Sequence, residues 1–408
     1  MLAFDDRSLT RPFGLRDAKA YALPTLGAPL LVLRTPDAWD GSEKQALSLG
    51  YAHELLRRRD PTRRPLWFET GLCELASTVE VAPPVVRIGR PLAEHLILLR
   101  DRPLPSLRST FDPSDFAGWS EPARALFAAR AWAVAHYLTL RDARGARVRA
   151  LDRYREALDA QERDPLAAAF GDPSALAGLV HEHVRRDRFQ EIGLRTEWSW
   201  QADAAQLAPV APARARSALG ELALALERPA LARDYFERAL RADARDLRAQ
   251  RGLVAALRLA GRVEQAAAQL ERARALAPDD PATGLETAEL ALARAQAAAG
   301  AAERAEAAAA ARARFRELLA RAPNAAAAEL GLARSYLVEG EASAEGRPAI
   351  ARARSLAPGS LEVDLVEARL AARSGRSAEA RLIAAEVWLR SPAATTRAAA
   401  REILDSLE

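Results

Sequence analysis

The side chains best suited to chemistry in this chain lie between residues 53 and 74. His53 and Glu54 are adjacent, and Glu69 and Glu74 follow in the next short segment. Imidazole nitrogen and carboxylate oxygen are ligands that Zn²⁺ takes in proteins, and a carboxylate can also deprotonate a metal-bound water. A catalytic zinc normally has three protein ligands and one open position. The question is therefore whether these residues complete such a site.

Two predicted helices have to position these side chains. The first should run from about residue 42 to residue 59, where an Asp-Pro sequence ends it, and it contains His53. The second is short and carries Glu69 and Glu74. Neighbouring residues on a helix face different directions. We therefore expect Glu69 and Glu74 to point away from the side to which Thr70, which lies between them in the sequence, points.

The two segments resemble the active-site region of gluzincin metallopeptidases. Residues 49–57 are Leu-Gly-Tyr-Ala-His-Glu-Leu-Leu-Arg, and residues 65–74 are Pro-Leu-Trp-Phe-Glu-Thr-Gly-Leu-Cys-Glu. In that family an H-E-x-x-H helix and the glutamate of a later W-x-x-E-G-x-A motif bind zinc, and the helix glutamate is the general base. If His53 began H-E-x-x-H, the second histidine would fall on Arg57, which cannot coordinate a metal. We take His53 as the second histidine, because the family's H-x-L-x-R and P-x-W flanks then match.

In this register the resemblance implies that the catalytic positions are degenerate. The first histidine corresponds to Leu49, the catalytic glutamate to Gly50 and the third ligand to Thr70, so that only His53 remains. One imidazole cannot hold a catalytic zinc, and no carboxylate is left to activate its water. The sequence therefore predicts no catalytic residue and no cofactor, with His53 as the one candidate metal ligand.

The resemblance covers about residues 4–190. Residues 86–91 resemble the strand that follows the motif, residues 127–138 resemble a helix that backs the active site in envelope-associated relatives, and residues 167–184 resemble the closing helices. The family's usual first strands and helix would precede Met1, so we expect a truncated domain or a misplaced start.

A repeat runs through the second half of the chain. Prolines recur at spacings of about 45, 35 and 34 residues, and a small residue stands twelve places before each. The prolines are Pro278, Pro323, Pro358 and Pro392, and the small residues are Ala266, Ala311, Gly346 and Ala380. An earlier unit has Gly220, Ala232 and Phe236 in matching places. The pattern resembles the tetratricopeptide repeat, in which small residues lie where two helices cross and a proline ends the second. An Ala-rich insertion near residues 300–310 lengthens the third unit.

Composition and charge narrow the class of protein. Lys and Arg number 59 against 55 Asp and Glu, and the net charge of +4 is too small for the dense positive field of a dedicated nucleic-acid binder. The single cysteine, Cys73, excludes an internal disulfide framework, and we expect it to be a small core residue. No run reaches the ~20 apolar residues of a membrane-spanning helix, and residues 1–7 show no signal peptide. The sequence leaves the compartment open: a periplasmic or envelope-associated protein if the true start lies upstream, and otherwise a cytoplasmic one.

These patterns predict two folded parts. An α+β, degenerate zincin-like domain spans residues 1–195, a linker spans 196–212, an all-α tetratricopeptide-like solenoid spans 213–392 and a capping helix spans 393–408.

The predicted function is a non-catalytic scaffold that binds a protein or peptide on the concave surface of the repeats, without nucleic acid as a partner. The alternative is an active zinc metallopeptidase with an unorthodox ligand set, in which His53 acts with Glu54, Glu69 or Glu74.

Overall fold

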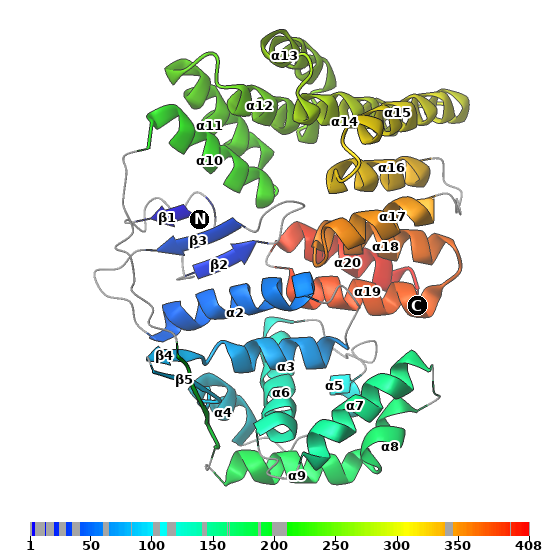
Figure 1. Cartoon of the computed structure of the whole chain (residues 1–408). Coiled ribbons are helices and arrows are strands. Elements are labelled where there is room, and N and C mark those ends of the chain that lie inside the picture. Colours follow the sequence, from blue (N-terminus) through cyan, green and yellow to red (C-terminus); the bar gives the residue numbers. More distant parts are fainter. Residues whose placement is uncertain are drawn as a thin grey trace. The chain divides into compact units, whose positions relative to one another are not determined.

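The computed structural model of the chain consists mostly of helices (Figure 1). It describes residues 2–4, 13, 20–23, 30–34, 41–59, 65–82, 84–100, 107–111, 120–140, 145–160, 162, 164–186, 189–197, 210–338, 346–391 and 393–407. The chain forms two compact units: a mixed unit of Trp39–Ala205, and a repeat unit of Met1–Ala38 with Gln206–Glu408. Residues 1–38 thus cluster with the repeat unit, and not with residues 39–195 as the sequence predicts. The predicted domain limits stay a prediction.

The mixed unit combines short helices with a small sheet. Its helices are α2 (Gly41–Arg59), α3 (Leu66–Ala76), α4 (Ala93–Arg100), α5 (Arg108–Phe111), α6 (Glu121–Leu140), α7 (Ala146–Asp159), α8 (Pro165–Phe170) and α9 (Pro173–Arg185). Its strands β4 (Glu80–Ala82), β5 (Val85–Ile88) and β6 (Ile192–Arg195) form an antiparallel sheet in the order β4-β5-β6. The helix predicted to end at residue 59 and the strand predicted at 86–91 are confirmed in outline.

Helices α3 and α6 make the core of the mixed unit. Trp67 on α3 and Trp132 on α6 are fully buried, and Cys73 on α3 is buried too, as predicted. A Cβ on Gly71 would lie 2.3 Å from the carbonyl oxygen of Ala131, so only glycine permits this approach. The close packing fixes the position of α3, which carries Glu69 and Glu74.

The repeat unit begins with a small sheet. Strands β1 (Leu2–Phe4), β2 (Ala20–Leu23) and β3 (Leu30–Arg34) lie in the order β1-β3-β2, with β1 parallel and β2 antiparallel to β3. Val32 of β3 belongs to the hydrophobic core that the first helical pairs form. The sheet is therefore packed on these helices.

Eleven helices follow between residues 210 and 407, within the described ranges, and they form five helical pairs and a last single helix. They are α10 (Pro212–Ala225), α11 (Pro229–Ala242), α12 (Leu247–Leu259), α13 (Val263–Leu276), α14 (Pro281–Ala297), α15 (Ala301–Arg321), α16 (Ala326–Val338), α17 (Gly346–Leu356), α18 (Leu361–Arg373), α19 (Ser377–Arg390) and α20 (Ala394–Asp405). The first helices of the pairs begin roughly 34 residues apart, except around the third pair, where α15 is 21 residues long. The predicted repeats and the predicted insertion are confirmed.

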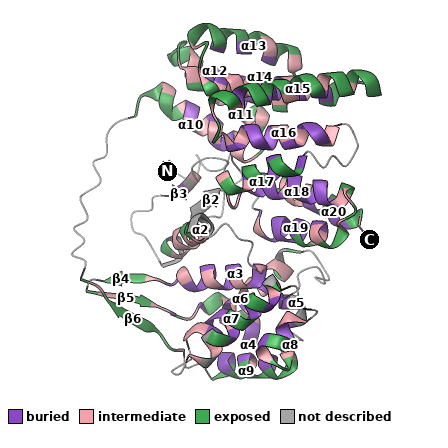
Figure 2. Ribbon diagram, turned by 45° about the vertical axis from the view of Figure 1, so that its right-hand side comes forward, coloured by how far each residue is buried: buried purple, intermediate pink, exposed green. Residues whose placement is uncertain are grey.

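Small residues let these helices pack closely. The repeat positions predicted to be small or apolar, such as Ala232, Ala266, Ala311 and Ala380, are fully buried (Figure 2). The ring of Phe236 on α11 fills the space that a side chain would need at Gly220 on α10 and at Gly252 on α12, where an added Cβ would meet the ring at 2.6 and 2.2 Å. One aromatic side chain thus joins a helical pair to the next pair.

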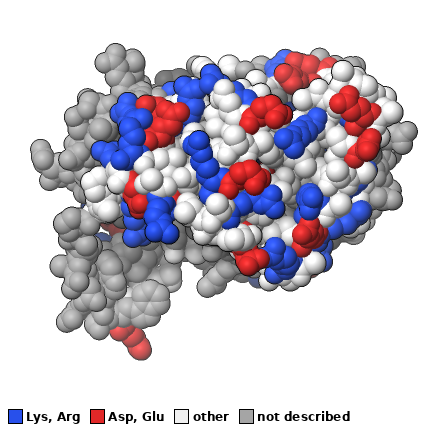
Figure 3. Space-filling view, turned by 90° about the horizontal axis from the view of Figure 1, so that it is seen from above, with Lys and Arg blue, Asp and Glu red and all other residues white. Residues whose placement is uncertain are grey.

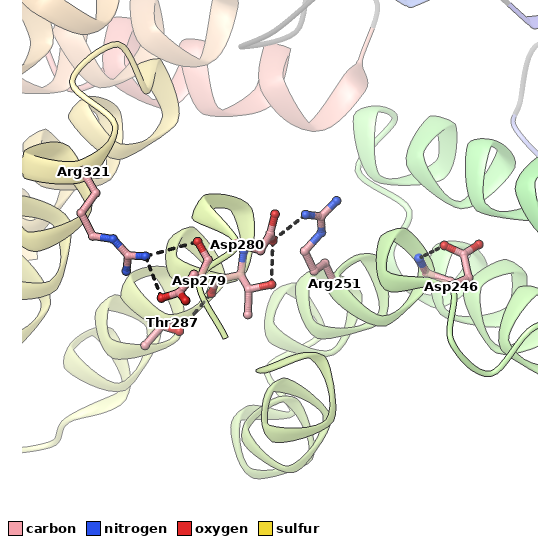
Figure 4. Close-up of polar contacts among 8 residues, drawn as sticks. Asp246, Arg251, Asp279, Asp280, Thr287 and Arg321 are labelled. Carbon is pink, nitrogen blue, oxygen red and sulfur yellow. Dashed lines mark hydrogen bonds and ion pairs between the residues drawn. The ribbon is translucent and has the colours of Figure 1, made fainter. Parts of the chain in front are cut away.

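Polar contacts between neighbouring pairs repeat with the same period (Figure 4). Asp246 caps α12 by accepting a hydrogen bond from the backbone N–H of Ala249 at 3.1 Å, and its other oxygen accepts one from Ser217 of α10 at 2.7 Å. Asp280 caps α14 in the same way and accepts a hydrogen bond from Arg251 of α12 at 2.6 Å. Each capping aspartate therefore also links its helical pair to the first helix of the preceding pair.

The turn of the first pair contacts the last helix. Glu227 has a φ of +55°, whereas glycines occupy the matching left-handed positions at Gly261 and Gly375. Its carboxylate accepts hydrogen bonds from Thr395 and from Thr396, the latter at 2.6 Å. A residue in a conformation that favours glycine is thus held by contacts to α20.

Candidate functional site

His53 and Glu69 lie together where α2 meets α3. The Nδ1 atom of His53 lies 3.2 Å from Oε1 of Glu69, and 30% of the histidine side chain but only 9% of the glutamate side chain is exposed. The expectation that Glu69 points away is wrong. A helix turns by about 100° per residue, and the packing of α3 against α2 brings the Glu69 side chain to His53. Glu74 does point elsewhere and contacts Nε2 of His95 on α4 at 3.3 Å.

Two of the degenerate positions lie near His53 on α2, and the third is next to Glu69 on α3. Leu49 and Gly50 are half-buried one turn earlier on α2, and Thr70 is half-buried beside Glu69 on α3. The side chain of Glu54 lies outside the described residues. Among the side chains that are described, no group of three or more His, Cys, Asp or Glu could hold a metal ion.

A second histidine pair is buried in the mixed unit. Nε2 of His136 donates to the carbonyl oxygen of Gly89 at 3.0 Å, so its Nδ1, 3.1 Å from Nε2 of His183, accepts a hydrogen bond from that neighbour. Both rings are almost fully buried, and burial lowers the pKa of His136. These contacts join α6 and α9 to the residue that follows β5, which is a structural role.

The helical pairs hold a pocket of different character. It has a volume of about 350 Å³ and lies near the carboxyl ends of α14, α16 and α18. Its charged lining consists of Arg304, Arg334, Arg369 and Arg373. Gln296 and an apolar wall of Leu337, Val338 and Val366 complete the described lining.

The four arginines differ in what already holds them. Arg334 contacts Glu289 at 3.2 Å and Glu362 at 3.7 Å. Arg304 donates to the carbonyl oxygen of Ala298 at 3.1 Å, and Arg373 donates to that of Leu337, so both guanidinium groups cap helix ends with part of their hydrogen-bonding capacity. In the described part of the chain, the exposed Arg369 makes no ion pair and no hydrogen bond.

A row of charged side chains leads up to this pocket along the first helices of four consecutive pairs, and it is largely buried except at Glu362, whose side chain is 54% exposed. Arg258 on α12 lies 3.6 Å from Glu286 and 3.2 Å from Glu289, both on α14. Glu289 in turn contacts Arg334 on α16, which contacts Glu362 on α18. The row holds three carboxyl groups but two guanidinium groups. Burial raises the pKa of Glu286 to about 7, because Glu289 adds to the effect of burial and Arg258 opposes it only in part.

Sequence reasoning missed the pocket, although a signal for it exists. Arg334 and Arg369 are each the ninth residue of the first helix of a pair, in α16 and in α18. Aligning the repeats and asking where cations share a position would have drawn attention to these two arginines.

Comparisons with known proteins add little. No protein-family model and no curated protein matches the chain. Among solved structures, a thermophilic tetratricopeptide-repeat protein of Thermus thermophilus is similar at 22% sequence identity with a TM-score of 0.41, over 48% of this chain and 98% of that one. Among the described residues, no helix is long and apolar enough to cross a membrane.

Proposed function

We propose that this chain is a non-catalytic scaffold that binds a protein or peptide through its helical pairs. The observation that carries the proposal is the arginine-lined pocket, because three consecutive pairs contribute to it from equivalent ends of their first helices. Arrays of helical pairs commonly present their first helices as one extended binding surface. A pocket on that row is where a bound segment would be gripped.

The binding proposal can be tested by photo-crosslinking in full-length protein. A benzophenone amino acid at Gln296, on the pocket, should crosslink a partner in extracts of the source cells. The same group at Ala268, exposed on the second helix α13, is the matched control and should crosslink little. Equal labelling at both positions, or none at Gln296, would count against binding by the first helices.

We further propose that the mixed unit is a metallopeptidase-like domain without a working centre. Leu49, Gly50 and Thr70 stand where the resemblance requires two ligands and a base. This support comes from the motif residues alone. The alternative, an active zinc enzyme, draws on the 3.2 Å contact between His53 and Glu69, since both could be ligands. A catalytic site would need a third ligand and a base besides.

Metal analysis separates the two readings. Purified full-length protein should contain far less than one zinc per chain and should bind added zinc weakly. The variant with Leu49→His, Gly50→Glu and Thr70→Glu together should gain zinc if the alignment is right. Stoichiometric zinc in the wild type, lost on Glu69→Gln, would favour the enzyme. A folded triple variant that gains no zinc would refute the register.

A further inference from the structure

We propose that the side chains of Glu227, Thr395 and Thr396 form a clasp that closes the helical pairs into a ring, and that release of this clasp opens the array. The first pair and the last helix stand at opposite ends of the repeat sequence, and they meet in space at this contact. The inference goes beyond the proposed scaffold, because it concerns how the array changes shape, and its test needs no partner.

The succession of the helices is the first argument (Figure 1). The first helices of the five pairs, α10, α12, α14, α16 and α18, each contact the next one, and α18 contacts α20. Helix α20 therefore takes the place of the first helix of a sixth pair. The turn that follows α10 contacts α20 through Glu227. A row of helices in which each contacts the next, and the last contacts the first, is a closed ring.

The type of residue at position 227 is the second argument. Helices α10, α12 and α18 end in the same kind of turn, with the backbone hydrogen bonds of a helix C-cap and one residue in the left-handed conformation. This residue is Gly261 after α12 and Gly375 after α18, but Glu227 after α10. Glycine adopts the conformation at the least cost. The glutamate is therefore explained by what its side chain does, and its described hydrogen bonds go to α20.

The first turn of α20 is suited to receive this carboxylate. Ala393 at the N-cap gives no side-chain hydrogen bond to the first N–H groups, and the first turn has no acidic residue of its own. The partial positive charge at a helix N-terminus favours a carboxylate nearby. Thr395 donates to one carboxylate oxygen of Glu227, and Thr396 donates to the other at 2.6 Å. Glu227 thus supplies from the first pair the anion that the last helix lacks.

The clasp is weaker than the packing within the array. Glu227 and Thr395 are exposed and Thr396 is half-buried, so water can replace these hydrogen bonds when they break. The first two pairs, by contrast, are joined by the fully buried ring of Phe236. Regions with few buried contacts open before the core does. The ring should therefore open at the clasp before any helical pair separates from the next.

A broad attraction between charged surfaces gives little support to the closure. On the face seen in Figure 3, the described basic and acidic side chains are interspersed and form no patch of one sign. The donors in the clasp are neutral hydroxyl groups. Salt screens attraction between exposed charges, so it should affect the closure less than loss of these side chains does.

The test measures the distance between the two ends by double electron–electron resonance on spin-labelled full-length protein. The labels are attached to Ala242→Cys, exposed at the end of α11, and to Ala398→Cys, exposed on α20. The native Cys73 is buried, which directs the label to the introduced cysteines. We expect one narrow distribution of distances in the chain with an intact clasp. Glu227→Gly removes the carboxylate and suits the turn, and it should add a longer distance in about a tenth of the molecules or more.

Second variants and controls separate the clasp from general damage to the fold. Replacing Thr395 and Thr396 together by valine keeps the shape of both side chains and should add the same longer distance. Glu264→Gln removes an exposed carboxylate elsewhere in the array and should leave the distribution unchanged. Labels at Ala242→Cys and Ala268→Cys, on the second helices of the first two pairs, should keep their distance in every variant.

Three results would overturn the inference. The first is an unchanged distribution in both Glu227→Gly and the double threonine variant, in samples with native circular dichroism. The second is a change between the two control labels as large as that between the ends. The third is a thermal midpoint that falls in Glu227→Gly, since loss of a clasp should leave the packing of the pairs intact. If the ends separate as expected while nothing crosslinks at Gln296, the clasp stands and the scaffold fails.

Discussion

Replacing Glu286 by glutamine should stabilise the protein above neutral pH and leave it nearly unchanged in mild acid. The side chain of Glu286 is 13% exposed, and its row holds three carboxyl groups against Arg258 and Arg334. Burial raises the pKa of Glu286 from 4.5 to about 7. Between these values the folded chain keeps a proton that the unfolded chain has lost, so the free energy of unfolding falls as pH rises.

The size of the effect follows from the same two pKa values. Each pH unit in this interval is worth about 1.4 kcal/mol, so ionised Glu286 costs the folded state up to about 3 kcal/mol above pH 7. Glutamine resembles the protonated side chain and removes this cost. The gain of Glu286→Gln over the wild type should grow from near zero at pH 4.5 to about 1–3 kcal/mol at pH 8.

Urea unfolding of full-length protein, followed by circular dichroism at pH 5 and pH 8, measures this difference. Glu264→Gln is the matched control, because the Glu264 side chain is 87% exposed and should change the midpoint little at either pH. The reasoning is refuted if Glu286→Gln gains the same stability at both pH values, or if it is less stable than the wild type at pH 8.

Two further pairs of substitutions test the packing of the helices. Gly252→Ala should lower the free energy of unfolding by about 1–3 kcal/mol, because the added Cβ would meet the buried ring of Phe236. Gly178→Ala on α9, where the added Cβ meets open space, should raise the free energy of unfolding by up to about 1 kcal/mol. Thermal unfolding distinguishes the two variants, and equal effects would contradict the packing. Asp280→Ala should cost about 1–2 kcal/mol at neutral pH through the lost cap, and Asp279→Ala, 96% exposed, much less. Burial alone would raise the pKa of Asp280, but hydrogen bonds from Arg251 and Thr283 hold that pKa below its usual value. The loss of stability in Asp280→Ala should therefore persist above pH 4 and shrink as pH falls through the lowered pKa. A loss of stability that grows in acid would contradict this.

The helical pairs could be predicted because their determinants recur at a fixed spacing. Ala266 and Ala311 stand at equal distances before prolines and lie buried at helix crossings, so a local pattern reports a local contact. Glu227 could not be predicted in its left-handed conformation, since a glutamate there gives no turn signal and the threonines that hold it are nearly 170 residues away.

The candidate sites were harder to predict because they depend on contacts between helices. The direction of Glu69 depends on how α2 packs against α3, which the spacing of the two segments does not determine. The arginine pocket gathers Arg304, Arg334 and Arg369 from three helices in a chain rich in arginine. Only the repeat alignment marks Arg334 and Arg369 as equivalent. The zincin-like character of the mixed unit remains a prediction from its motifs.

The central claim is that this chain binds a protein and does not hydrolyse it. The most direct measurement takes the partner identified by crosslinking at Gln296, incubates it with full-length protein and equimolar zinc, and records the intact mass of the partner across the complex peak in size-exclusion chromatography. We expect the partner to elute with the chain at unchanged mass. A partner cut at defined bonds, and protected by a metal chelator, would contradict it.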